Sequence, residues 1–150
     1  MRILIQRVSE ASVRIHNVIH GEINRGMVIF VGVETEDRPE DIDWLVQKVN
    51  GLRIFNDTDG KMNLSHRAVA GAFLVISQFT LHASTKKGNR PGYSKAAQPD
   101  HAVPMYELFV EKLRTVTGAK VATGKFGADM KVSLVNEGPV TIWIDSKNRE

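Results

Sequence analysis

The sequence predicts a mixed α/β fold, a single domain over residues 1–150 with three layers, β/β/α, in which two packed sheets carry two main helices on one outer face. The chain has 150 residues, 42% of them hydrophobic, which suits one globular core. Short runs with strand periodicity fill both ends of the chain, and only two segments have helical periodicity. Two helices are too few to cover both faces of a large parallel sheet, so we expect both on one face.

The first third of the chain is expected to hold four strands and one helix. The strands are predicted at Ile3–Val8, Val13–Ile15, Val18–Ile23 and Met27–Val33, where apolar residues alternate or run together. Asp37 is a candidate helix cap, and Pro39 suits the first helical turn. Apolar residues then follow at helical spacing as far as Gly51: Ile42, Leu45, Val46 and Val49. This helix is therefore amphipathic.

The remaining elements follow the same reasoning. A short strand at Leu52–Phe55 ends in the turn Asp57–Gly60, and a long apolar strand with a polar end is predicted at Ala72–Leu81. A long loop precedes a second helix, which ends near Gly118 and has these residues at helical spacing: Val103, Tyr106, Val110, Leu113 and Val116. Closing strands are predicted at Val121, Met130–Val135 and Val140–Ile144.

The composition excludes several classes of protein. The chain has no cysteine, which excludes a disulfide framework, a thiolate nucleophile and thiolate metal sites. Its apolar run at Met27–Val33 is far shorter than the ~20 residues of a membrane span. Arg2 and Arg7 interrupt the apolar start of the chain, which does not read as a signal peptide. We therefore expect a cytoplasmic protein with no membrane partner.

Charge is unevenly distributed along the chain. Residues 60–99 contain six basic and no acidic side chains: Lys61, Arg67, Lys86, Lys87, Arg90 and Lys95. Residues 1–59 carry more acidic than basic side chains, and residues 100–150 carry equal numbers of the two. Such a segment attracts polyanions, although a solvated basic loop would have the same composition.

Two motifs fall short of known binding sites, and no cofactor or metal is expected. Gly118–Lys125 looks like a phosphate loop, but five residues separate its glycines where the motif needs four, and Phe126 replaces the magnesium-binding Ser or Thr. His16 and His20 lie four apart, but they fall on a predicted strand and turn, where they do not share a helical face.

Polar residues end the long strand at Ser77–Leu81. Strand alternation would place Ser77 and Phe79 on one face and Gln78 and Thr80 on the other, so that one ligand could contact both members of a pair. An ordinary strand end with hydrogen-bonding caps is the alternative. Asn136–Thr141 contains Gly138–Pro139 between two predicted strands, which is typical of a tight turn.

Several motifs together resemble the D-aminoacyl-tRNA deacylase family. They are Ile5–Val8, Ala11–Val13, Arg53–Phe55, Gly60–Leu64, Ser77–Leu81, Arg90–Pro91, Ser94–Lys95, Phe126 with Ala128–Met130, and Asn136–Thr141. Each motif is weak alone, but their order and spacing run from end to end of the chain. The resemblance implies an enzyme that hydrolyses the ester of a D-amino acid, or of glycine, on the terminal ribose of tRNA, with rejection of L-aminoacyl-tRNA.

The resemblance also implies a homodimer with composite active sites. The catalytic strand of one chain, Ser77, Gln78, Phe79 and Thr80, would face Gly138 and a cis Pro139 of the other. Ala128 and Met130 would lie near the adenosine, and Lys86, Lys87, Arg90 and Lys95 would bind tRNA phosphates.

Two roles for Thr80 compete. Its hydroxyl could be a nucleophile, or its backbone N–H and that of Phe79 could polarise the ester carbonyl while the ribose 2′-hydroxyl assists hydrolysis. We favour the second, because no general base for the hydroxyl can be identified, and an unactivated hydroxyl is a weak nucleophile. The competing function is a nucleic-acid-binding module without hydrolysis, which would stack bases on Phe79 or Tyr93.

Overall fold

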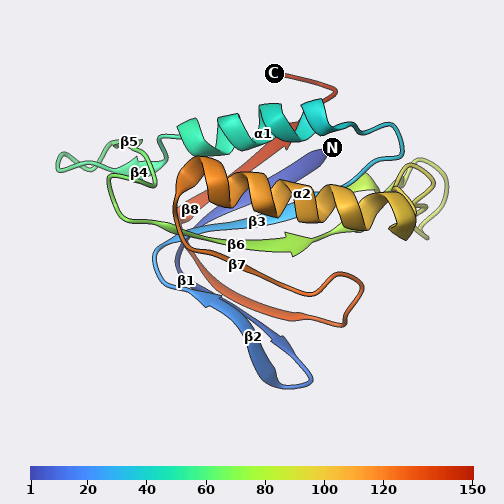
Figure 1. Cartoon of the computed structure of the whole chain (residues 1–150), viewed down its shortest axis with the longest axis horizontal. Helices are drawn as coiled ribbons and strands as arrows, with labels where there is room; N and C mark the ends of the chain where they lie inside the picture. Colours follow the sequence, from blue (N-terminus) through green and yellow to red (C-terminus); the bar gives the residue numbers. More distant parts are fainter.

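The computed structural model describes residues 1–150 and has the mixed α/β fold that the sequence predicts, with two helices beside a large sheet (Figure 1). The elements in chain order are β1 (Arg2–Ile15), β2 (Val18–Ile23), β3 (Gly26–Gly32), α1 (Pro39–Gly51), β4 (Phe55–Asn56), β5 (Met62–Leu64), β6 (Ala72–Ser77), the 3-10 helix η1 (Phe79–His82), α2 (Pro99–Thr117), β7 (Val121–Thr123) and β8 (Lys131–Asp145). No helix is both long and apolar enough to span a membrane.

The main sheet has the strand order β2-β1-β3-β6-β7, with β8 paired to β1. The pairs β1–β2, β1–β3 and β1–β8 are antiparallel, whereas β3–β6 and β6–β7 are parallel. β1 changes neighbours along its length, because residues 2–8 pair with β3 and residues 11–15 pair with β2. The β4–β5 hairpin forms a separate two-stranded sheet.

The two β layers are halves of one folded sheet, which refines the expectation of two packed sheets. An apolar cluster lies between the halves: Val8, Ala11, Val13, Ile23, Val28, Leu74 and Ile76. The first four belong to the β1–β2 half, and the other three point from β3 and β6. The β1–β8 pairing shifts register near the middle of β1. Such irregularities bend a strand, which lets one continuous sheet form both layers.

Both helices pack on the other face of β3 and β6, as the sequence predicts (Figure 1). Alternate strand residues supply this larger core, among them Ile29 from β3 and Val75 from β6. α1 contributes the predicted apolar face, and α2 ends at Gly118, whose φ of 65° closes the helix in the left-handed region. Asp37 is not the helix cap: Asp41 instead accepts the Arg38 N–H at 2.9 Å.

Two predicted strand boundaries at the ends of the chain are wrong. The opening strands form one strand, Arg2–Ile15, and the two closing strands form one strand, Lys131–Asp145. Ser9 and residues 137–139, which fall between predicted strands, lie at the register shifts, where each strand continues past an irregularity. The short strand predicted at Leu52–Phe55 starts later, at Phe55.

Candidate active site

β6 ends at Ser77, and the chain turns at once into η1. The turn is made at Gln78, with φ of −146° and ψ of 80°, and its N–H donates to the Val31 carbonyl of β3 at 2.7 Å. The strand alternation predicted for residues 77–80 is therefore wrong. Phe79 extends the apolar pattern of the strand, but its backbone is already helical.

η1 lies against the end of β3, and a glycine makes this approach possible. A Cβ atom at Gly32 would lie 3.0 Å from the Gln78 carbonyl oxygen and 3.1 Å from Cδ2 of His82. The His82 Nε2–H donates to the Gly32 carbonyl at 3.1 Å, and the side chain is 2% exposed. Burial lowers the pKa of His82, and the Arg2 charge adds to this effect. The neutral ring therefore fixes η1 to β3.

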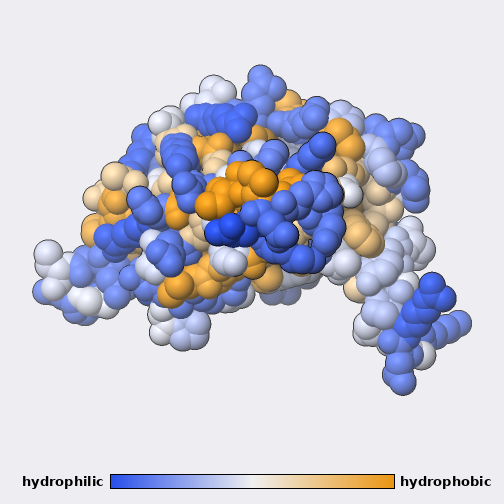
Figure 2. All heavy atoms as spheres, turned by 90° about the horizontal axis from the view of Figure 1, so that it is seen from below, coloured by the Kyte–Doolittle hydropathy of each residue, from blue (hydrophilic) through white to orange (hydrophobic).

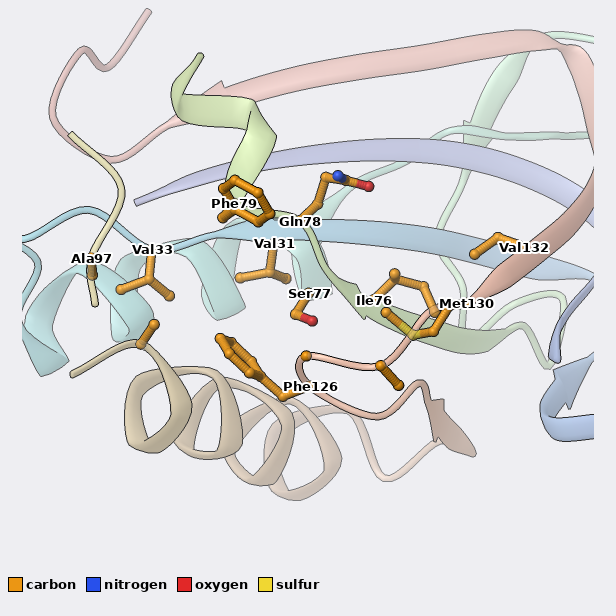
Figure 3. Close-up of a pocket in the computed structure, with 13 residues that line it drawn as sticks. Val31, Val33, Ile76, Ser77, Gln78, Phe79, Ala97, Phe126, Met130 and Val132 are labelled. Carbon is orange, nitrogen blue, oxygen red and sulfur yellow. The ribbon is translucent and has the colours of Figure 1, made fainter. Parts of the chain in front are cut away.

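A cavity of about 290 Å³ opens beside this turn (Figure 3). Its lining is mainly apolar and comes from β3, the end of β6, the start of α2 and the loop before β8: Val31, Val33, Ile76, Ser77, Gln78, Phe79, Ala97, Ala102, Phe126, Gly127, Ala128, Met130 and Val132. Figure 3 shows Val33 and Ala97 at one end and Ile76, Met130 and Val132 at the other. Five of the predicted site residues therefore line one cavity: Ser77, Gln78, Phe79, Ala128 and Met130.

Polar groups are concentrated at the η1 side of the cavity. Gln78 donates its side-chain amide to the Thr80 hydroxyl. Phe79 and Thr80 begin a helical turn, so their N–H groups have no carbonyl one turn earlier in the helix. The backbone hydrogen bonds outside the regular elements include none from either N–H. Neither N–H therefore has a hydrogen-bond partner within the chain, although Thr80 itself does not line the cavity.

Gly138 and Pro139 do not line this cavity. They lie exposed in β8, in a segment of four residues, 137–140, that bulges opposite the single β1 residue Arg7. The expected tight turn is therefore a bulge within a continuous strand. The Gly138–Pro139 peptide bond is cis, as expected.

Buried Arg7 anchors the bulge. Its Nε–H donates to the Glu137 carbonyl at 2.9 Å, and Nη1 donates to the Ile54 carbonyl at 2.6 Å. Arg7 is 5% exposed, and a Cβ atom at Gly138, where φ is 134°, would lie 2.9 Å from its Nη2. Sequence reasoning missed this role, although a charged residue within the apolar run Ile5–Val8 is the signal that could have indicated it.

The predicted tRNA-binding residues lie on the loop between η1 and α2. Ser84 and Gly92 pair as an antiparallel bridge that closes the tip of this loop. The basic side chains of the loop are all exposed: Lys86, Lys87, Arg90 and Lys95. The loop returns to the cavity through Tyr93, whose ring meets Phe79 edge to face, with centroids 4.9 Å apart. The basic side chains of the loop therefore lie beside the cavity and do not line it.

The apolar wall of the cavity is the part that sequence reasoning did not assign. The sequence predicts Val31 and Val33 as strand residues and gives Phe126 as part of a family motif, because their spacing does not distinguish a cavity wall from a core. No group of three or more His, Asp or Glu side chains is placed to hold a metal ion.

Comparisons with known proteins agree from end to end of the chain. The sequence model of the family described as D-Tyr-tRNA(Tyr) deacylase matches residues 4–145. Proteins named D-aminoacyl-tRNA deacylase from Akkermansia muciniphila, Flavobacterium johnsoniae and Bacteroides fragilis (strain YCH46) are 55%, 57% and 58% identical over 150 residues, the whole of both chains in each case.

Solved structures give the same result for the fold. A structure named c-Myc DNA Unwinding Element Binding Protein superimposes with a TM-score of 0.90 at 35% identity, and the match covers 97% of this chain and 98% of the other. A structure described as a probable eukaryotic D-amino acid tRNA deacylase has a TM-score of 0.84 over 95% of this chain and 97% of the other. At 15% identity, the second likeness shows the fold alone.

Proposed function

The chain belongs to the D-Tyr-tRNA(Tyr) deacylase family, and we propose that it hydrolyses the ester bond of D-aminoacyl-tRNA, releasing the D-amino acid and tRNA. The observation that carries this proposal is the turn into η1 beside a mainly apolar cavity: Phe79 lines the cavity, Thr80 follows it, and neither backbone N–H is used in a hydrogen bond within the chain. The reaction would protect translation in the cytoplasm from D-amino acids. It needs no cofactor in this scheme.

The cavity suits the terminal adenosine. Phe126 and Met130 provide apolar surface for a base, while Ser77 and Gln78 provide polar groups for a ribose. Phe79, at the edge of the cavity, is exposed, so the amino acid would extend past Phe79 towards the surface.

Ester hydrolysis needs little help from side chains here, because an aminoacyl ester is already activated. The N–H groups of Phe79 and Thr80 would donate to the ester carbonyl oxygen and stabilise its negative charge as water attacks the carbonyl carbon. The bond from that carbon to the ribose oxygen then breaks, and the oxygen takes a proton. The neighbouring 2′-hydroxyl would assist this proton transfer.

Discrimination against L-amino acids would come from a second subunit. Gly138 and Pro139 are exposed and lie outside their own chain's cavity, so they can reach the cavity of a partner in a homodimer. Large apolar side chains are also exposed on the molecule, among them Phe79 at 55% and Trp143 at 48%. Figure 2 shows apolar patches among polar side chains on the side away from the helices.

A rigid main-chain wall explains selectivity better than a fitted pocket. A hydrophobic pocket discriminates one methylene by only ~1–3 kcal/mol, which is too little to protect L-aminoacyl-tRNA. Backbone carbonyls next to the substrate Cα would instead leave no space for an L side chain. Glycine lacks a side chain and would still fit, so glycyl-tRNA, such as tRNA(Ala) mischarged with glycine, would be a second substrate.

The test is hydrolysis of three purified substrates: D-tyrosyl-, glycyl- and L-tyrosyl-tRNA. We expect the protein to release D-tyrosine and glycine and to leave L-tyrosyl-tRNA intact. Equal rates for the D and L esters would contradict the proposed selectivity. Binding of tRNA with no hydrolysis of any ester would favour the alternative, a non-catalytic nucleic-acid-binding module.

A further inference from the structure

A second cavity, of about 300 Å³, lies next to the candidate active site. It is formed by β2, α2, the end of β7 and the segment that follows it, and its charged or titratable lining residues are His20, Tyr106, Glu107, Arg114 and Lys125. Phe126 lines both cavities, which therefore adjoin at this residue. A ligand that fills the first cavity and extends past Phe126 would reach the second cavity.

The wall between the cavities is held firmly. The Phe126 ring packs against Tyr106 with centroids 6.0 Å apart, and the Tyr106 hydroxyl donates to the Val75 carbonyl at 2.8 Å. On the other side, a Cβ atom at Gly124 would lie 2.4 Å from Sδ of Met130. Glycine there lets the segment before Phe126 run close to a residue of the first cavity. The spacing of the two cavities is therefore fixed by packing.

The second cavity carries unneutralised positive charge. Neither Arg114 nor Lys125 forms an ion pair, although Glu107 lines the same cavity. One guanidinium N–H of Arg114 donates to the Val121 carbonyl at 3.1 Å, which fixes the group and leaves its other donors free. Lys125 is exposed and makes no side-chain hydrogen bond. Two cations thus outweigh one carboxylate.

We propose that this cavity binds a backbone phosphate of the tRNA 3′ end, next to the nucleotide held in the candidate active site. The inference rests on the proposed function, since it uses the position of the terminal adenosine. Arg114 would donate hydrogen bonds to the phosphate oxygens, and Lys125 would supply a mobile charge. The contact would fix the direction in which the RNA leaves the active site, without reading its sequence.

The test separates phosphate binding from ester hydrolysis by using a substrate that lacks phosphate. The variants are Lys125→Glu and Arg114→Gln, with Lys125→Arg to keep the charge and Lys48→Glu as a matched charge reversal at an exposed position of α1 that lines neither cavity. Each protein is assayed with D-tyrosyl-tRNA and with 3′-O-D-tyrosyl-adenosine. Its Kd for uncharged tRNA is measured separately.

We expect Lys125→Glu to lower kcat/KM for D-tyrosyl-tRNA about tenfold more than kcat/KM for D-tyrosyl-adenosine, mainly through KM. Lys125→Arg should keep the wild-type kcat/KM for D-tyrosyl-tRNA, and Lys48→Glu should resemble the wild type on both substrates. An equal loss on both substrates, or unchanged tRNA affinity, would overturn the phosphate site. Absence of hydrolysis by the wild type would overturn the proposed function, while the tRNA affinities would still decide the phosphate site.

Discussion

The contributions of the Thr80 hydroxyl and of the Thr80 backbone N–H to hydrolysis can be separated experimentally. Its hydroxyl accepts a hydrogen bond from the Gln78 amide, whereas its N–H is free. Thr80→Val keeps the backbone donor and the shape of the side chain but removes the hydroxyl. We therefore expect kcat for D-tyrosyl-tRNA to fall by less than about tenfold, which is less than about 1.4 kcal/mol of transition-state stabilisation.

A substrate with a 2′-deoxy terminal ribose lacks the hydroxyl that is proposed to assist proton transfer. We expect it to reduce the single-turnover rate of the wild-type protein more than Thr80→Val does. Complete loss of turnover in Thr80→Val, with intact fold and tRNA binding, would contradict the backbone-donor mechanism and favour a nucleophilic hydroxyl.

At the scale of elements, η1 depends on a neutral histidine. Because burial lowers the pKa of His82 below 6.5, the unfolded chain takes up a proton at a higher pH than the folded protein does. The contribution of neutral His82 to the free energy of unfolding is therefore complete above about pH 6.5, and it is lost as the pH falls towards the pKa of His82 in the folded protein. The other buried nitrogen, Nδ1, has no hydrogen-bond partner, so no acceptor is in place for a second proton.

We expect the free energy of unfolding to decrease between pH 7.5 and pH 5.5, and to decrease less in His82→Leu. Urea unfolding at the two pH values measures this difference. His66 is also buried with a lowered pKa, and it contributes equally to both proteins. The same decrease in the wild type and the variant would mean that His82 is not responsible.

The loop between η1 and α2 is expected to bind phosphates without reading sequence. Lys86 and Lys87 are exposed near its tip, beyond the Ser84–Gly92 bridge. Replacing both by alanine should weaken tRNA binding and lower the log-log salt slope by roughly 0.7–0.9 for each phosphate that the loop no longer binds. Titrations of tRNA affinity against salt give the slope. An unchanged affinity and slope would show that these lysines are only solvated.

The regular elements were predictable because their signals are local. The periodicity of α1 and α2 and the apolar run of β3 lie within each segment, and the structure places these elements where the pattern does. η1 was missed because Phe79 continues the pattern of β6, whereas the helical turn depends on contact with Gly32. The bulge in β8 was missed for a similar reason, since Arg7, which holds it, lies 130 residues away from Glu137.

At the scale of the whole molecule, the proposed site needs two chains. Ala128→Trp would fill the cavity of its own subunit, and Gly138→Val would distort the bulge offered to its partner. Each variant alone should be inactive. After subunit exchange at equal concentrations, half of the dimers contain one of each chain, and each of these has one intact site. The mixture should recover about one quarter of the wild-type activity.

Exchange can be followed by mass spectrometry of differently tagged subunits. If heterodimers form and the mixture stays inactive, both motifs act within one chain and the composite site is wrong.

Filling the cavity tests most directly whether the ester is cleaved there. Single-turnover release of D-tyrosine from D-tyrosyl-tRNA is measured for the wild type, for Ala128→Trp, and for Ala68→Trp, which adds the same side chain at an exposed position outside the cavity. We expect the wild type and Ala68→Trp to cleave the D ester at similar rates and to spare L-tyrosyl-tRNA, and folded Ala128→Trp to be inactive. Wild-type rates in Ala128→Trp would place the reaction elsewhere on the molecule.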